Sequence, residues 1–123
     1  MRLLNNFYHI EQFIPGENEA RFVVSFHADS QIYQAHFPGQ PITPGVCIIE
    51  TARELLEEYL EAEMELCHVK NIKFLAVIIP EEGNTFTYGF TKLQTAEELT
   101  KLQVTVTSGD IVYAKMSFTC KKR

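Results

Sequence analysis

The amino-acid sequence predicts an α+β fold in which an antiparallel, curved sheet of about six strands wraps around one long central helix. Most of the 123 residues lie in short segments rich in β-branched and aromatic residues, which favour strands. Only one segment has the length and pattern of a long helix, with two strands before it and four after it. That order cannot build the βαβ units of a parallel sheet. We expect residues 1–123 to fold as a single domain.

The first two strands are predicted over residues 7–13 and 20–27, joined by the turn signal Pro15-Gly16-Glu17-Asn18. In the second strand Phe22, Val24 and Phe26 alternate with more polar neighbours. This two-residue period indicates a strand with one buried face, and the pair therefore forms a hairpin.

The helix is predicted from residue 46 to about residue 63, after a stiff loop. The loop, residues 36–45, contains three prolines and two glycines and therefore suits neither a helix nor a central strand. The helix is apolar on every side in its first half and carries many glutamates in its second half. We expect it to be buried at its start and solvated at its end.

Four strands are predicted after the helix. Residues 72–79, IKFLAVII, form a nearly continuous apolar run, which is typical of a strand covered on both faces. Phe86, Tyr88 and Phe90 alternate with threonines or glycine, and residues 102–106 alternate likewise. The last strand spans residues 111–119 after a turn at 108–110. We expect the aromatic row to lie in the core.

The composition excludes several classes of protein. A formal net charge of −5 with no basic stripe disfavours nucleic acid as a partner. No apolar run is long enough to span a bilayer, and the first residues lack the pattern of a signal peptide, so we expect a cytoplasmic protein with no membrane partner. The three cysteines share no CxxC spacing, and His9, His27 and His68 show no metal-ligand spacing, so we expect no metal site.

His36 and Glu50 are the candidate acid/base pair, because the stiff loop and the first turns of the helix join them. Imidazole titrates near neutrality and can take up and return a proton. Glu50 follows the apolar stretch VCII, where desolvation favours the neutral carboxyl group, which can act as an acid. The Gly45 N–H lies among the unpaired donors of the helix N-terminus and can stabilise a developing oxyanion.

These residues resemble the signature of a known family. Residues 36–50 are HFPGQPITPGVCIIE, and both the proline–glycine pattern and the spacing from His36 to Glu50 resemble those of the bacterial 3-hydroxyacyl-(acyl carrier protein) dehydratases. Residues 71–80, NIKFLAVIIP, are similar to the strand that follows the helix in that family. The resemblance implies a hot-dog fold and reversible dehydration of a (3R)-3-hydroxyacyl thioester to the trans-2-enoyl thioester in fatty acid or related acyl-chain biosynthesis.

The resemblance also implies roles for individual residues. His36 removes the α proton, Glu50 protonates the departing hydroxyl, and the Gly45 amide holds the thioester carbonyl. The other residues implied in substrate binding line the site or the acyl tunnel: Phe37, Pro38, Gly39, Val46 and Phe74.

The family's partners and assembly are implied as well. The substrate arrives on the phosphopantetheine arm of an acyl carrier protein, and no metal or organic cofactor is needed. Each site takes its histidine and its carboxylate from different subunits of a homodimer, and a trimer of dimers is a larger assembly compatible with the same pairing.

The sequence departs from the family at several positions: Ala35 replaces a glycine, Glu54 replaces a glutamine, and Pro80-Glu81-Glu82 replaces Pro-Gly-Asp. Glu54 lies one helical turn after Glu50, so the two charges would repel each other. Arg53, where relatives have a small apolar residue, either offsets that repulsion or points elsewhere.

Two alternative functions remain open on this evidence. One is a hot-dog thioesterase or enoyl-CoA hydratase, although thioesterases of this fold generally lack the proline–glycine signature. The other is a subunit that binds acyl carrier protein without catalysing a reaction, which the three unusual residues Ala35, Arg53 and Glu54 would support.

Overall fold

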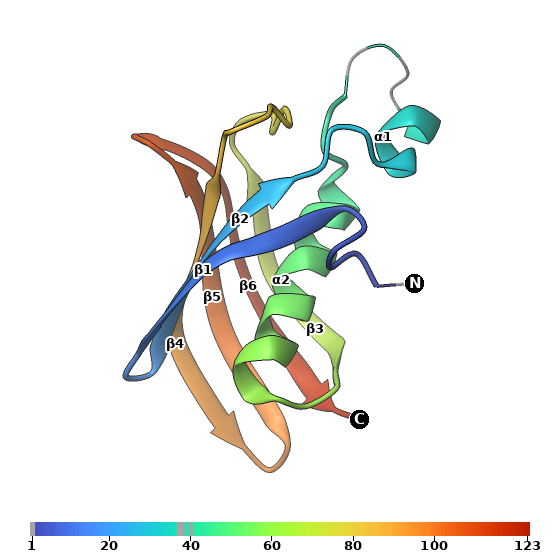
Figure 1. Ribbon diagram of the computed structural model, residues 1–123. Helices are drawn as coiled ribbons and strands as arrows, with labels where there is room; N and C mark the ends of the chain where they lie inside the picture. Colours follow the sequence, from blue (N-terminus) through green and yellow to red (C-terminus); the bar gives the residue numbers. More distant parts are fainter. Residues whose placement is uncertain (1, 37–38, 40) are drawn as a thin grey trace.

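The computed structural model describes residues 2–36, 39 and 41–123, and for His36 it describes the backbone alone. The chain forms six strands and two helices, seen in Figure 1, in the order β1 (Tyr8–Gly16), β2 (Glu19–Phe26), α1 (Gln31–His36), α2 (Gly45–Leu60), β3 (Met64–Phe74), β4 (Phe86–Ala96), β5 (Leu99–Ser108) and β6 (Ile111–Lys122). Within the described ranges, neither helix has the length and apolar character needed to cross a lipid bilayer.

All six strands belong to one antiparallel sheet with the order β1-β2-β4-β5-β6-β3. The sheet curves around α2, which lies against its concave face (Figure 1). This arrangement confirms the predicted α+β fold, a curved antiparallel sheet around a helix. β1 and β3 form the two edges of the sheet, and the site described below lies toward the β3 edge.

The core lies between the concave face of the sheet and α2. The predicted aromatic row is confirmed, since Phe86, Tyr88 and Phe90 are all buried, and the helix contributes Leu55 and Leu56, which are fully buried. Burial of each such side chain stabilises the fold by about 1.5–3 kcal/mol. Helix and sheet are therefore held together by apolar packing along the middle of α2.

Two features near the helices differ from the prediction. Helix α2 ends at Leu60, a few residues earlier than expected, because Glu61 adopts the left-handed conformation (φ 52°) and caps it. The six-residue helix α1 was not predicted, since so short a helix has no detectable periodicity and depends on tertiary contacts. Its Tyr33 provides such a contact, because its ring is buried and stacks on Phe7 with centroids 4.9 Å apart.

The predicted third strand is wrong in both position and environment. The strand spans Met64–Phe74 rather than residues 72–79, and it lies at the edge of the sheet. Several residues of the apolar run are exposed, among them Phe74, Leu75 and Val77. An apolar run predicts that the segment is covered, but it does not reveal whether the covering residues belong to the same chain.

Candidate active site

Helix α1 and the N-terminal end of α2 lie at one end of the molecule (Figure 1). Two hydrogen bonds fix the end of the loop: the hydroxyls of Tyr33 and Thr43 are 2.8 Å apart, and the Thr43 N–H donates to the Ile78 carbonyl at 2.9 Å. Tyr33 and Thr43 are buried, and this burial raises the pKa of Tyr33 above its usual range. The chain therefore enters α2 from a fixed position.

Gly45 is the first residue of α2, directly after the N-cap residue Pro44. A Cβ atom on Gly45 would lie only 2.8 Å from Cζ of Phe74, so glycine is required for the close packing of that ring. No described residue accepts a hydrogen bond from the N–H of Gly45 or Val46. The helix tip thus presents backbone donors beside an aromatic ring, and the Val46 side chain next to them is exposed.

His36 is the last residue of α1, and its side chain lies outside the described part of the structure. Phe37 and Pro38, two of the predicted substrate-binding residues, also lie outside it. Gly39 is described and has a positive φ of 88° with open space around it, which favours glycine at this turn. The roles of His36, Phe37, Pro38 and Gly39 remain predictions.

Glu50 lies on α2 five residues after Gly45, which corresponds to a rise of about 7.5 Å along the helix. Its side chain is 36% exposed, so the single chain does not enclose the carboxylate in the way that the apolar sequence around it suggested. Arg53 donates its Nε–H to Oε1 of Glu50, and no described residue donates to Oε2. One carboxylate oxygen is therefore held in place and the other is available.

Arg53 is held by three groups at once. Besides Glu50, its Nη1 donates to the Met64 carbonyl at 2.7 Å and pairs with Oε2 of Glu57 at 3.0 Å, and its side chain is only 15% exposed. Burial opposes the positive charge, but the hydrogen bond to Glu50 and the carboxylates of Glu50, Glu57 and Glu54 outweigh it and raise the pKa of Arg53. Arg53 therefore offsets the negative charge of Glu50 rather than pointing elsewhere.

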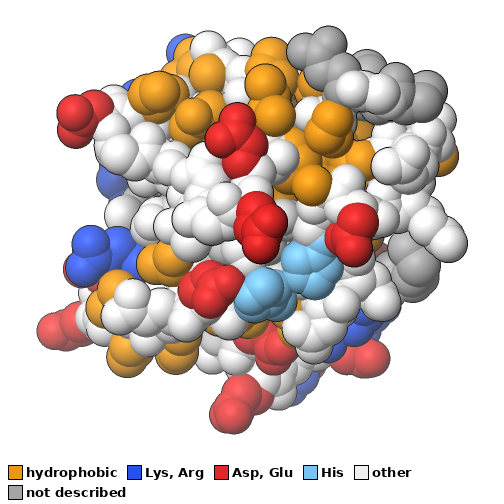
Figure 2. All heavy atoms as spheres, turned by 45° about the horizontal axis from the view of Figure 1, so that its top comes forward, with side chains coloured by type: hydrophobic (Ala, Val, Ile, Leu, Met, Phe, Trp, Pro, Cys, Tyr) orange, Lys and Arg blue, Asp and Glu red, His pale blue; other side chains and the backbone are white. Residues whose placement is uncertain are grey.

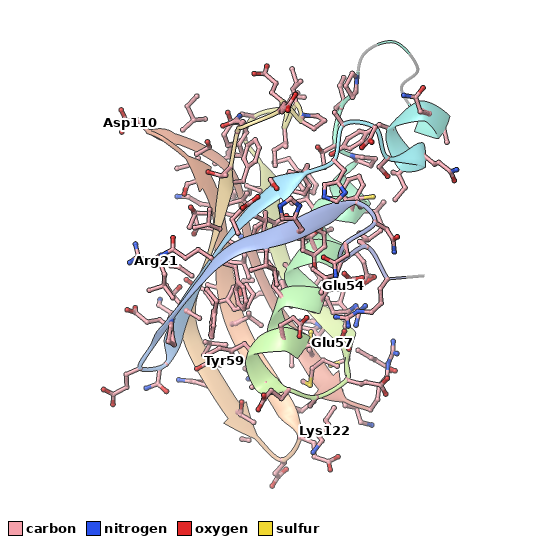
Figure 3. All side chains as sticks on the ribbon, in the orientation of Figure 1. Arg21, Glu54, Glu57, Tyr59, Asp110 and Lys122 are labelled. Atoms are coloured by element: carbon pink, nitrogen blue, oxygen red, sulfur yellow. The ribbon has the colours of Figure 1, made fainter. Side chains whose placement is uncertain are left out.

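Glu54 has an entirely different environment, although it lies one turn from Glu50. It is fully buried, and it accepts hydrogen bonds from the N–H groups of Leu3 (2.7 Å) and Leu4 (2.9 Å) and from the Tyr8 hydroxyl (3.1 Å). Figure 3 shows Glu54 on the side of α2 that faces the N-terminal segment. Burial, together with the nearby Glu54 carboxylate, raises the pKa of Tyr8 above its usual range. Glu54 anchors the N-terminal segment to α2.

The sequence contained a signal for the Glu50–Arg53–Glu57 network that the prediction did not use fully. Residues three and four apart on a helix lie on the same face, so Arg53 is spaced to reach both glutamates. The separation of Glu54 from this network had no such signal, because its partners come from residues 3–8, about 50 positions away in the chain.

Exposed apolar residues occur at the start of α2, on the edge strand β3 and just after it; we call this set the β3 edge surface. It comprises five exposed side chains, namely Val46 (70%), Val69 (41%), Phe74 (49%), Leu75 (53%) and Val77 (57%). Exposed apolar groups at an unpaired strand edge favour association with another strand. The other edge strand, β1, carries His9, Glu11 and Gln12 in its middle, polar residues that discourage such pairing.

A second polar cluster lies on β1 and β2. Nδ1 of His9 and Nε2 of His27 are 2.8 Å apart, and Glu11 contacts His9. Figure 2 shows the two histidines side by side among acidic side chains, with hydrophobic side chains gathered on the same face. Across the described residues, no group of His, Cys, Asp or Glu side chains has an arrangement suited to a metal ion.

A curved antiparallel sheet wrapped around one long helix defines the fold class of the protein, the hot-dog fold. Residues 12–116 match the model of the ApeI-like family, described as ApeI dehydratase. The chain therefore belongs to the ApeI-like dehydratase family, which confirms the resemblance found in the sequence.

Two enzymes with similar sequences carry the same name. The chain is 30% identical over 117 residues to the 3-hydroxyacyl-(acyl-carrier-protein) dehydratase FabZ of Clostridium acetobutylicum, covering 89% of this chain and 82% of that protein. It is 26% identical over 116 residues to FabZ of Ligilactobacillus salivarius, with the same coverage of 89% and 82%.

Similar solved structures agree on the fold. The dehydratase heterocomplex ApeI:P from Xenorhabdus doucetiae matches with a TM-score of 0.71 at 18% identity, covering 91% of this chain and 96% of that chain. A hypothetical thioesterase with coenzyme A from Streptococcus pneumoniae TIGR4 matches with a TM-score of 0.63 at 14% identity, covering 94% and 85%. At these identities the two structures establish the hot-dog fold and leave the reaction to be argued from the site.

Proposed function

We propose that this protein catalyses the reversible dehydration of a (3R)-3-hydroxyacyl thioester, carried on acyl carrier protein, to the trans-2-enoyl thioester. The imidazole of His36 takes the proton from the α carbon, and the electron pair of that C–H bond forms the new C=C bond. The C–O bond at the β carbon breaks, and the hydroxyl leaves as water with a proton from Glu50. The N–H of Gly45 stabilises the negative charge that develops on the carbonyl oxygen of the thioester.

The observation that carries this proposal is the arrangement of Gly45 and Glu50 on α2. The helix begins with backbone donors that have no acceptor among the described residues, and Glu50 lies less than two turns further along. Phe74 packs so closely on Gly45 that its exposed ring is also placed to contact a bound acyl chain. Family membership and the FabZ relatives support a dehydratase over the thioesterase and hydratase alternatives.

Arg53 acts in this proposal as a positioning residue. It binds one oxygen of Glu50 and leaves the other oxygen free for the β-hydroxyl of the substrate. Because Arg53 is itself fixed by Met64 and Glu57, it holds the Glu50 carboxyl group in one orientation.

We further propose that the active unit is at least a homodimer in which two β3 strands pair and cover the β3 edge surface. Such pairing would cover the exposed Val69 and Phe74 and enclose Glu50 from outside the single chain, which supplies the desolvation expected from the sequence. The similarity to the ApeI:P heterocomplex makes a second hot-dog subunit the alternative occupant of the same edge. Sedimentation of the purified chain alone distinguishes the two, since a monomer would exclude the homodimer.

A direct assay tests the reaction. The purified chain, supplied with carrier-bound 3-hydroxyacyl substrates of graded length and no added metal or cofactor, should form 2-enoyl products detectable by mass spectrometry. The His36→Ala variant should lose this activity. Release of free carrier thiol without an enoyl product would favour a thioesterase, and carrier binding without turnover would favour a non-catalytic subunit.

A further inference from the structure

A buried pair of hydroxyl groups joins helix α1 to the residues that lead into α2. The hydroxyls of Tyr33 and Thr43 are 2.8 Å apart, and both side chains are buried. Burial raises the pKa of the Tyr33 hydroxyl, although the hydrogen bond to Thr43 opposes that rise, so the pair is uncharged and does not titrate near neutral pH. The contact is therefore a neutral hydrogen bond in the interior of the protein, where bulk water does not compete for it.

Both partners of this hydrogen bond are fixed by further contacts. The Tyr33 ring stacks on Phe7, with ring centroids 4.9 Å apart, and Phe7 is itself fully buried. The Thr43 N–H donates to the Ile78 carbonyl at 2.9 Å, and the Ile78 side chain is buried as well. Neither hydroxyl can move far without disturbing closely packed neighbours. The hydrogen bond thus fixes α1 relative to the end of the loop.

The pair lies close in the chain to two groups that the proposed mechanism must bring together. His36, the proposed base, is the last residue of α1 and follows Tyr33 by three residues, a rise of about 4.5 Å. Gly45, the proposed oxyanion donor, follows Thr43 by two residues, a span of at most about 7 Å. Because both connections are short, a shift at the hydrogen bond changes the separation between the base and the donor directly.

Stability alone does not account for two hydroxyl groups at this place. A hydrogen bond between neutral groups contributes little net free energy to folding, because each hydroxyl gives up a hydrogen bond to water. An apolar pair of the same shape can therefore be equally stable. What the hydroxyls add is a fixed distance and direction. Such precision matters for a reaction, since a misplacement of about 1 Å can lower an enzymatic rate about 100-fold.

We propose that the hydrogen bond between Tyr33 and Thr43 sets the position of His36 relative to the Gly45 N–H. Tyr33 and Thr43 are then positioning residues for the dehydration. This inference rests on the proposed function, which assigns the base to His36 and the oxyanion donor to Gly45. The hydroxyl pair complements Arg53, because Arg53 orients the acid whereas the pair places the base.

Two single substitutions and their combination test this role. Tyr33→Phe and Thr43→Val each remove one hydroxyl and leave the other buried without its partner, so each should lower the melting temperature. The double variant Tyr33→Phe/Thr43→Val contains no unpaired hydroxyl of this pair and should regain most of the lost thermal stability. Its kcat should nevertheless stay roughly tenfold below the wild-type value, with a smaller change in KM, because the base is misplaced while the substrate keeps its contacts.

Thr43→Ser and Tyr8→Phe are the matched controls. Thr43→Ser keeps the hydroxyl but loses a buried methyl group, so it should be less stable than the wild type and retain a similar kcat. Tyr8→Phe removes another buried tyrosine hydroxyl, one that donates to Glu54, and should lower stability without lowering kcat. These controls separate the loss of a hydroxyl at this pair from a general loss of stability.

Two outcomes would overturn the positioning role. One is a double variant that recovers wild-type kcat together with its stability, and the other is an equal loss of kcat in Thr43→Ser and Thr43→Val. Steady-state kinetics with a carrier-bound 3-hydroxyacyl substrate gives kcat and KM, and thermal unfolding followed by circular dichroism gives the stability. If the wild type forms no enoyl product, the proposed function fails, and the positioning role fails with it. Wild-type turnover that the double variant retains would instead overturn the positioning role alone.

Discussion

Glu50 and Glu54 are one helical turn apart on α2, yet they differ in almost every physical respect. Glu54 is fully buried and accepts three hydrogen bonds from residues 3–8, whereas Glu50 is 36% exposed and contacts a single cation. A buried carboxylate with all its partners supplied contributes to stability, and a carboxylate with a free oxygen can react. The comparison shows that donors from distant residues, rather than position on the helix, distinguish the structural acid Glu54 from Glu50, the acid that we propose for catalysis.

The largest expected effect is the loss of turnover when Glu50 is changed. Glu50→Gln should lower kcat by about 10³-fold, because the amide cannot donate the proton that the departing hydroxyl needs. Thermal unfolding should change little, since the residue is partly exposed and its neighbour Arg53 keeps Glu57 and the Met64 carbonyl. Steady-state kinetics tests the predicted loss of kcat, and a melting curve tests the predicted thermal stability. Wild-type turnover in this variant would remove Glu50 from the mechanism.

The opposite pattern is expected for Glu54. Glu54→Ala should lower the free energy of unfolding by about 3 kcal/mol or more, because it leaves three donors without their acceptor in a buried site. Glu54→Gln keeps an acceptor oxygen and should be less destabilising. Urea denaturation measures the change, and kcat per folded molecule should stay near the wild-type value. A selective loss of kcat with unchanged stability would contradict the contrast between the two glutamates.

Arg53 binds Glu50 and Glu57 but forms no hydrogen bond or ion pair with Glu54, so its removal should have an intermediate effect. Arg53→Gln should lower kcat roughly tenfold with a smaller change in KM, because Glu50 loses its fixed orientation while the substrate keeps its contacts. Arg53→Lys should recover part of the rate, since it restores a cation. If both variants changed kcat and KM equally, and these changes followed a loss of unfolding free energy, Arg53 would have a purely structural role.

The smallest effect is expected from a single donor to Glu54. Tyr8→Phe removes the hydroxyl that donates to Glu54 at 3.1 Å but leaves the two backbone donors in place. It should therefore cost about 1 kcal/mol of unfolding free energy and leave kcat unchanged. The matched control is Tyr113→Phe, at a tyrosine that does not contact Glu54. If both variants lost the same unfolding free energy, the hydrogen bond from Tyr8 to Glu54 would contribute no more to stability than the hydroxyl of Tyr113.

The fold was largely predictable because its signals are local. The alternation in β2, β4 and β5 and the single long amphipathic helix identify strands and helix from neighbouring residues alone. The short helix α1 and the true limits of β3 were not predictable in this way. Helix α1 depends on the packing of Tyr33. Much of the apolar run at 72–79 is exposed in the single chain, so apolar composition alone did not reveal that the chain leaves this segment uncovered.

The sequence by itself determined the candidate chemistry: the proline–glycine loop, His36, Gly45 and Glu50 and their spacing, and with them the family. Only the tertiary structure decided which acid on α2 is saturated, which one keeps an oxygen without a donor among the described residues, and how β3 pairs with β6. The physical reason is the range of the interactions. Loop stiffness and helix spacing depend on residues a few positions apart, whereas the donors to Glu54 and the strand pairing of Lys73 with Lys115 join residues about 40 to 50 positions apart.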